Sequence, residues 1–237
     1  MALPKLGYPT YELELPSTGK TIKYRPFLVK EEKVLLMALE SKDEKQVIGA
    51  VKDLIKNCVI TRIKVDTLPS FDLEYLFLKI RGASIGENII LTVTCLDDNE
   101  TQVEATINID EVEVFKPEGH DKKIMFDDKT GIVMRYPSMK EFVEREFLQK
   151  EMKTEEVYDY IADSIDQIFD DEEVYDSSTT TKKEFRTFVD SLTTKQFEKI
   201  QQFYTTCPKL SHTFKVVNPN TGKESEYTVE GLQSFFA

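Results

Sequence analysis

The sequence lacks the residue clusters on which most catalytic and metal sites depend. Trp is absent, and only two His and three Cys occur among 237 residues. Cys207 is the nearest Cys to His212 and none lies near His120, whereas a zinc site needs four ligands at workable spacing. The chain also has no Gly-rich phosphate-binding loop, and Gly82 and Gly86, on either side of Ser84, are expected at a helix end and a tight turn. These absences argue against an enzyme, a bound cofactor and a metal site.

Disulfides and membrane segments are not expected either. Cys58, Cys95 and Cys207 are widely spaced and odd in number, which argues against a disulfide framework. No apolar run approaches the roughly eighteen residues needed to cross a bilayer. The first residues, Met1–Lys5, have no apolar signal core. We therefore expect a soluble, cytosolic protein with no membrane partner.

Negative charge is concentrated in one part of the chain. The formal net charge is −12, and residues 155–176 contain ten Asp or Glu and no Lys or Arg. This balance disfavours nucleic acid as a partner and favours a positively charged one. An EF-hand calcium-binding loop beginning at Asp170 is not expected, because Tyr175 and Thr181 stand where that motif needs Gly and Glu.

Part of the acidic segment is predicted to form one face of a helix. The spacing of Val157, Tyr158, Ile161, Ile165 and Ile168 predicts a helix with an apolar side. The opposite side carries, within about 60° by helical arithmetic, Asp159, Asp163, Asp166 and Asp170. Two interpretations stay open: a solvated face followed by an acidic loop, or a face that docks onto a basic partner.

The hydrophobic patterning predicts an α+β fold of β-hairpins packed with amphipathic helices in two lobes. Hairpins are expected at residues 11–25, 88–109 and 213–229, with short strands at 123–126 and 131–136. Helices are expected at 29–40, 41–58, 71–81, 138–147, 157–168, 182–192 and 193–204, with capping boxes beginning at Ser41, Ser138 and Thr193. Residues 170–181 have the composition of a polar linker.

Pro117-Glu118-Gly119 is the best candidate for a boundary between the lobes. It separates an N-terminal lobe of hairpins and helices, residues 1–117, from a mostly helical lobe with a terminal hairpin, residues 118–237.

The helix expected at residues 71–81 is apolar on two opposite sides. One stripe consists of Leu73, Leu76, Phe77 and Ile80, and the other of Phe71, Tyr75 and Leu78. A surface helix needs only one apolar face. This helix therefore either lies between two layers of its own domain or presents Phe71, Tyr75 and Leu78 to another protein.

Several segments spread over most of the chain carry a family resemblance. They are Leu15–Lys20, Tyr24–Lys33, Phe71–Leu78, Ser84–Glu87, Ser191–Glu198 and the hairpin after His212. These segments, taken in this order along the chain, resemble a family of baseplate proteins from T-even-like contractile-tailed bacteriophages. The resemblance is weakest at residues 140–180 and includes no catalytic signature.

What the resemblance implies is a baseplate hub subunit, or an assembly factor (chaperone) for the hub and the tape-measure protein. Such a protein acts without catalysis by binding other phage tail proteins. It works in the host bacterial cytoplasm during assembly, and either stays in the virion or acts only in assembly. The alternative from another class is a free acidic regulatory protein that mimics nucleic acid and binds a basic partner.

Overall fold

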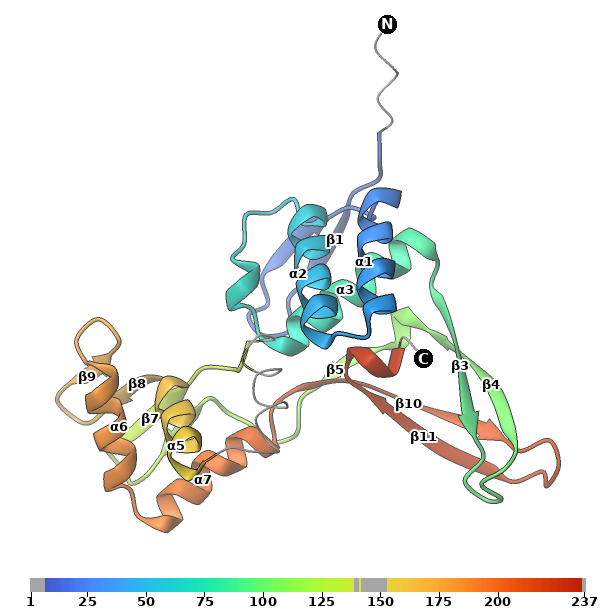
Figure 1. The fold of residues 1–237 in the computed structure, drawn as a ribbon. Coiled ribbons are helices and arrows are strands. Elements are labelled where there is room, and N and C mark those ends of the chain that lie inside the picture. Colours follow the sequence, from blue (N-terminus) through green and yellow to red (C-terminus); the bar gives the residue numbers. More distant parts are fainter. Residues whose placement is uncertain (1–6, 139–140, 142–152, 236–237) are drawn as a thin grey trace, which may run out of the picture. The chain divides into compact units, whose positions relative to one another are not determined.

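The computed structural model describes residues 7–138, 141 and 153–235 (Figure 1). The described residues form helices and small antiparallel sheets, which confirms the predicted α+β class. By its internal contacts the chain divides into two compact units. The first unit is Met1–Phe115 with Lys209–Ala237, and the second is Lys116–Pro208. No helix in the described part of the chain is both long and apolar enough to cross a bilayer.

The first unit begins with the predicted N-terminal hairpin. β1 (Tyr11–Glu14) pairs antiparallel with β2 (Thr21–Tyr24). Lys23 and Glu12 lie opposite each other and form an ion pair of 3.1 Å. Ile22, on the other side of β2, is completely buried.

Three helices follow in the first unit: α1 (Val29–Ser41), α2 (Glu44–Cys58) and α3 (Ser70–Ile85). The predicted capping box at Ser41 is wrong. Ser41 is the last residue of α1, where its hydroxyl donates to the Ala38 carbonyl at 2.6 Å. The chain reverses at Lys42, which has φ 55°, and Asp43 then caps α2 by accepting a hydrogen bond from the Lys45 amide.

α3 is the central helix of the first unit and packs on two sides. It contacts α2, and it also contacts β5 (Glu113–Phe115) and β10 (Lys209–Val217). At Gly82 it passes close to a neighbouring turn, where an added Cβ would lie 3.4 Å from the Ile109 side chain. Gly86, with φ 131°, ends the helix as its C-cap.

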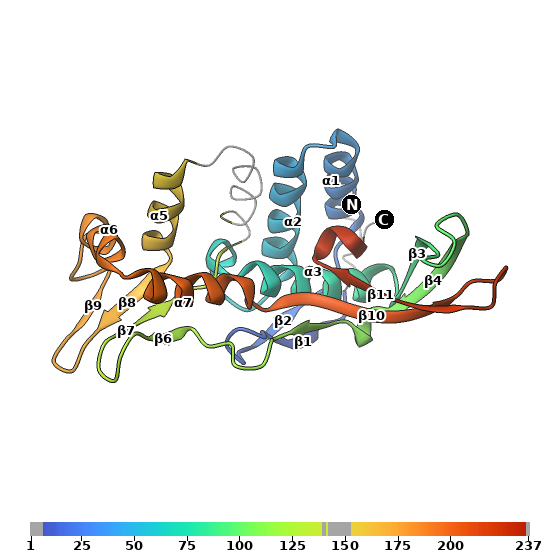
Figure 2. The same cartoon turned by 90° about the horizontal axis from the view of Figure 1, so that it is seen from below.

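Two further sheets complete the first unit (Figure 2). β3 (Asn88–Thr94) and β4 (Gln102–Asn108) form the predicted second hairpin. β11 (Glu224–Glu230) pairs with β10, and β10 pairs with β5. The turn of the C-terminal hairpin is tied to the turn of the second hairpin, because the Asn218 amide donates to both Asp97 and Asp98 at 2.9 Å.

The C-terminal hairpin lies in the first unit, whereas the patterning assigned it to the lobe of residues 118–237. Lys209 pairs with Phe115 and Leu210 with Val114, so the chain returns beside the strand at which it left. Leu210 is completely buried in a cluster with Leu78 and the β3–β4 hairpin. No local pattern indicates this return, since the paired strands are almost a hundred residues apart.

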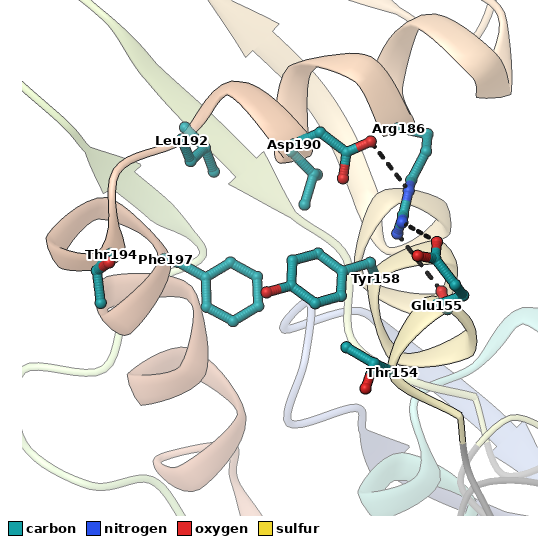
Figure 3. A pocket seen from close by; sticks show the side chains of 9 residues that line it. Thr154, Glu155, Tyr158, Arg186, Asp190, Leu192, Thr194 and Phe197 are labelled. Carbon is teal, nitrogen blue, oxygen red and sulfur yellow. Dashed lines mark hydrogen bonds and ion pairs between the residues drawn. The ribbon is translucent and has the colours of Figure 1, made fainter.

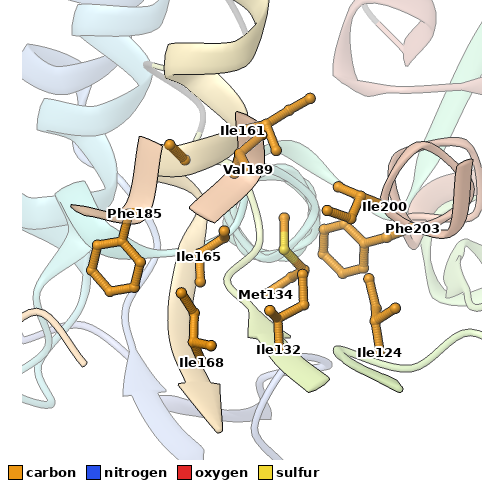
Figure 4. Packing of buried hydrophobic residues seen from close by; sticks show 11 residues of the cluster. Ile124, Ile132, Met134, Ile161, Ile165, Ile168, Phe185, Val189, Ile200 and Phe203 are labelled. Carbon is orange, nitrogen blue, oxygen red and sulfur yellow. The ribbon is translucent and has the colours of Figure 1, made fainter. Parts of the chain in front are cut away.

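The second unit is one antiparallel sheet with helices on one face (Figure 2). The sheet has the order β6 (Lys123–Met125), β7 (Gly131–Met134), β8 (Ile165–Phe169) and β9 (Val174–Asp176). The helices in its described residues are α5 (Thr154–Asp163), α6 (Lys182–Ser191) and α7 (Thr194–Thr205). Their buried side chains form one cluster (Figure 4): Ile124, Ile132, Met134, Ile161, Ala162, Ile165, Ile168, Phe185, Val189, Ile200 and Phe203.

The helix predicted at residues 157–168 ends early. α5 stops at Asp163, and the next residues form β8. Ile165 and Ile168 are buried as predicted, at 5% and 8% exposure, but from a strand. Part of the expected polar linker is also strand, since β9 pairs with β8.

A β-bulge explains why the helical pattern was misleading. Gln167 lies opposite Val133, but Ile165 lies opposite Met134, so Asp166 is an extra residue in β8. The extra residue brings two side chains three positions apart onto the same buried face. That is also the spacing of a helix face, and the pattern could not separate the two structures.

The helix predicted from Ser138 lies mostly outside the described residues, including Met139, Phe142, Val143 and Phe147. Its predicted capping box is present. The Ser138 amide donates to a Glu141 carboxylate oxygen at 2.8 Å, and the Glu141 amide donates to the Ser138 hydroxyl at 3.3 Å.

Candidate interaction surfaces

The apolar stripe considered for partner binding on α3 lies in the core of the first unit. Phe71 and Leu78 are 3% and 0% exposed. Tyr75 is half-buried against the cluster that contains Leu78 and Leu210, and its ring lies 5.3 Å from the Lys79 ammonium. The structure thus matches the other interpretation, a helix between two layers of its own domain. Phe71, Tyr75 and Leu78 serve folding and are not carried into the proposals below.

The first unit instead exposes apolar side chains on α1. Val29, Val34, Leu36 and Met37 are 80%, 53%, 52% and 60% exposed, whereas Leu35 is buried. By helical arithmetic the four exposed side chains fall within an arc of about 160°. We call them the α1 outer face. Sequence reasoning predicted this helix but not its exposed side, although the unbroken apolar run at residues 34–39 was a signal that more than one face is apolar.

The four aspartates predicted on one helix face lie on different elements of the second unit. Asp159 and Asp163 are on α5, Asp166 is the bulge residue of β8, and Asp170 begins the turn to β9. All four are exposed. They therefore do not form the continuous acidic face that the sequence predicted, because β8 interrupts the helix.

Several of these carboxylates are already engaged within the second unit. Asp163 forms an ion pair of 2.7 Å with Lys182 of α6. Asp170 accepts hydrogen bonds from the backbone amides of Glu172 and Glu173 at 2.9 Å, which stabilise the turn and lower the pKa of Asp170. The acidic segment is thus partly neutralised by its own neighbours.

Arg186 on α6 is the centre of a charged cluster (Figure 3). Its guanidinium lies 2.6 Å from Glu155, 3.4 Å from Asp190 and 3.6 Å from Asp159. It also lies over the Tyr158 ring, 5.0 Å from the centroid. The Arg186 side chain is only 19% exposed, but the three carboxylate side chains are 82%, 52% and 67% exposed. The cluster joins α5 to α6 and leaves an excess of negative charge at the surface.

A pocket with a volume of about 410 Å³ lies beside this cluster. We call it the α5–α7 pocket. Its lining residues are Thr154, Glu155, Tyr158, Arg186, Val189, Asp190, Leu192, Thr194 and Phe197. The Tyr158 and Phe197 rings are stacked with centroids 5.0 Å apart and form an aromatic wall (Figure 3). Sequence reasoning missed this pocket because its residues come from α5, α6, α7 and the connection between them.

Two groups that could act in nucleophilic or acid–base chemistry, Cys58 and His120, are buried. Burial raises the pKa of Cys58 to about 11, which disfavours the reactive thiolate. His120 is 7% exposed and lies between the Thr206 hydroxyl at 2.9 Å and the Tyr136 hydroxyl at 3.1 Å. Within the described ranges, no group of three His, Cys, Asp or Glu side chains could hold a metal ion.

The fold is that of an α+β protein with an exposed apolar helix face on one unit and a charged pocket on the other. A family model described as T4 bacteriophage base plate protein matches residues 8–237. Because this match covers nearly the whole chain, the protein belongs to that family of phage baseplate proteins. Comparisons with curated proteins and with solved structures found no match.

Family membership confirms the resemblance predicted from the sequence segments. It identifies a bacteriophage baseplate protein and implies interaction with other phage tail proteins. The match extends over both units, including the region of residues 140–180 where the resemblance was weakest.

Proposed function

We propose that this protein is a baseplate hub subunit, or a factor that assembles the hub with the tape-measure protein, and that it acts by protein–protein binding without catalysis. The observation that carries the proposal is the family match over residues 8–237. The buried and hydrogen-bonded state of Cys58 and His120 supports a role in binding over a role in chemistry.

The α1 outer face supports contact with another tail protein. Exposed apolar side chains on a helix are a frequent feature of protein interfaces, because association removes them from water. Leu36 and Met37 lie near the middle of α1 and are more than half exposed. Since the family assembles with other tail proteins, we assign this face to a neighbouring hub or tape-measure protein with an apolar surface.

The alternative of a nucleic-acid mimic has less support. A mimic needs a regular array of free carboxylates, but Asp163 is paired with Lys182 and Asp159 lies near Arg186. The acidic segment also changes from helix to strand after Asp163.

Co-expression of the full chain with the hub and tape-measure proteins of the same phage tests the binding proposal. We expect co-purification, and we expect the double variant Leu36→Lys with Met37→Lys to lose it while unfolding at the same temperature as the wild type. Ile90→Lys is a matched control, because Ile90 is 59% exposed on β3 of the same unit. Unchanged capture by the α1 variant would contradict the assignment of α1, and no capture by the wild type would contradict the binding proposal.

Mass spectrometry of purified virions beside infected-cell lysate separates the two proposed roles. A hub subunit is present in virions at a fixed ratio to other baseplate proteins. An assembly factor is present in the lysate, with tail intermediates, and absent from virions. Presence in the lysate without association with tail intermediates or virions would contradict both.

A further inference from the structure

We propose that the α5–α7 pocket binds a lysine or arginine side chain presented by a partner protein. The inference rests on the proposed function, because the ligand belongs to another protein chain. It adds the chemistry of the contact and a second binding surface, separate from the α1 outer face.

Charge is the first reason for a cationic ligand. Among the described residues, Arg186 is the only cation that lines the pocket, and it is already shared among Glu155, Asp159 and Asp190. The cluster therefore keeps two net negative charges. Its carboxylates are the exposed members, whereas the guanidinium is mostly covered. An incoming cation meets carboxylate oxygens first.

The apolar wall is the second reason, and it favours a long side chain over a small ion. The apolar part of the pocket lining consists of Tyr158, Val189, Leu192 and Phe197, and Glu155 and Asp190 are its carboxylates. Lys and Arg combine an apolar stem with a cationic end, so the stem packs on the wall while the end reaches the carboxylates. Aromatic rings add attraction for the cation.

Other ligand classes fit less well. A purely apolar side chain would leave the two excess negative charges of the cluster uncompensated. Thr154 and Thr194 are the first residues of α5 and α7, and helix N-termini attract anions. At α5, however, that position is already occupied by Glu155 and Glu156 of its first turn. The three carboxylates around Arg186 repel any further anion.

A peptide titration of the full-length protein tests the proposal. The probe is the blocked tripeptide acetyl-Gly-Lys-Gly-amide, followed by NMR of the Val189 and Leu192 methyl groups. The analogue with norleucine in place of lysine keeps the apolar stem without the ammonium group, and the analogue with glutamate reverses the charge. We expect the methyl signals to shift with the lysine peptide and to shift far less with either analogue. Equal shifts with norleucine, or larger shifts with glutamate, would overturn the proposal.

Variants then locate the binding. The double variant Glu155→Gln with Asp190→Asn should weaken binding of the lysine peptide by about tenfold or more, because both carboxylates are lost. Asp166→Asn is the matched control, since it removes an exposed carboxylate of the same unit outside the pocket. Thr194→Lys keeps every carboxylate but supplies a competing cation from this chain, and it should also block the peptide. Equal weakening by Asp166→Asn would show non-specific attraction and overturn the site.

The co-purification assay separates failure of this site from failure of the proposed function. If the lysine peptide does not bind but tail proteins are still captured, the pocket proposal is overturned and the binding function stands. If the peptide binds and Glu155→Gln with Asp190→Asn also reduces capture, the pocket is part of the interface. Peptide binding without any effect of these changes on capture would overturn its assignment to a partner.

Discussion

At the scale of single residues, several buried polar side chains have specific partners that fix the local fold. Asp72 is completely buried and accepts hydrogen bonds from the backbone amide and the hydroxyl of Ser17, and burial raises its pKa. Arg25 and Glu31 form a buried ion pair of 2.9 Å, and Arg25 also donates a hydrogen bond to the Asn57 carbonyl. Together these contacts join the start of α1 to the end of α2. Perturbed groups of this kind often mark active sites, but here they are closed off from solvent and fully engaged.

Two glycines give a matched test of packing at this scale. A Cβ at Gly131 would lie 2.6 Å from the Ile124 carbonyl oxygen and 2.6 Å from the Phe169 ring, whereas a Cβ at Gly49 on α2 meets nothing within 4 Å. We expect Gly131→Ala to destabilise the protein by about 1–3 kcal/mol through overpacking. Gly49→Ala should stabilise it by about 0.5–1 kcal/mol through helix propensity. Urea unfolding measures both, and a neutral Gly131→Ala would contradict the described β6–β7 pairing.

His120 predicts a pH dependence of stability. The Thr206 hydroxyl donates to the Gln202 carbonyl at 2.8 Å, so it accepts from Nδ1–H of His120, and Nε2 accepts from the Tyr136 hydroxyl. This network fits the neutral ring. Burial lowers the pKa of His120, nearby Lys116 lowers it further, and Asp121 opposes the change.

The sign of the effect follows from proton linkage. The unfolded chain binds a proton at His120 near pH 6.5, but the folded protein does so only at lower pH. The stability that the neutral His120 ring contributes is therefore complete above about pH 6.5. It is lost as the pH falls towards the pKa of His120 in the folded protein. Urea unfolding between about pH 7.5 and 5 should show wild-type stability falling more steeply than that of His120→Gln. Parallel curves for the two proteins would contradict this account.

At the scale of secondary-structure elements, the burial of α3 on both sides is the feature that sequence reasoning could describe but not interpret. Leu76 belongs to one stripe and Leu78 to the other, and both are completely buried. The sequence shows two apolar stripes whether the helix is buried on both sides or on only one. Which stripe is covered depends on β5 and β10, whose pairing joins distant parts of the chain.

Alanine substitutions on α3 test this burial. We expect Leu76→Ala and Leu78→Ala each to lower the free energy of unfolding by about 2–5 kcal/mol, because both leave cavities. Leu36→Ala on the α1 outer face should change it by less than about 0.5 kcal/mol. Thermal denaturation of the three variants measures the order of their stabilities. A mild effect of Leu78→Ala beside a large effect of Leu76→Ala would mean that the second stripe is exposed.

The elements that could be predicted are those with strong local signals. Ile89 and Leu91 alternate with exposed residues on β3, and Thr193 with Gln196 forms the capping box predicted for α7. β5 has only three residues and takes its partner from the far end of the chain, so it carries no local signal. The α5–α7 pocket was not predictable for the same reason, since tertiary packing brings its residues together.

At the scale of the whole molecule, the chain leaves the first unit after Phe115 and returns to it at Lys209. The second unit is therefore continuous in sequence, and its core cluster lies entirely within residues 116–208. The first unit is made of two separate segments, and Leu210 and Phe235 of the later segment are buried in its core.

Two fragments test this organisation. We expect residues 116–208 to unfold cooperatively when expressed alone, because the fragment keeps its sheet, helices and described core. Residues 1–115 alone should not fold stably, since they lack the strand that pairs with β5 and the buried Leu210. Circular dichroism during heating distinguishes the outcomes. A cooperative transition for 1–115, or none for 116–208, would contradict the division.

The central claim is that this protein works in tail assembly by binding other tail proteins, and loss of the protein during infection tests it most directly. A phage carrying an early stop codon in this gene should yield, in a non-suppressing host, heads without complete tails in electron micrographs. Expression of the wild-type protein from a plasmid should restore infectious particles. A normal yield of tailed, infectious phage without this protein would contradict the account.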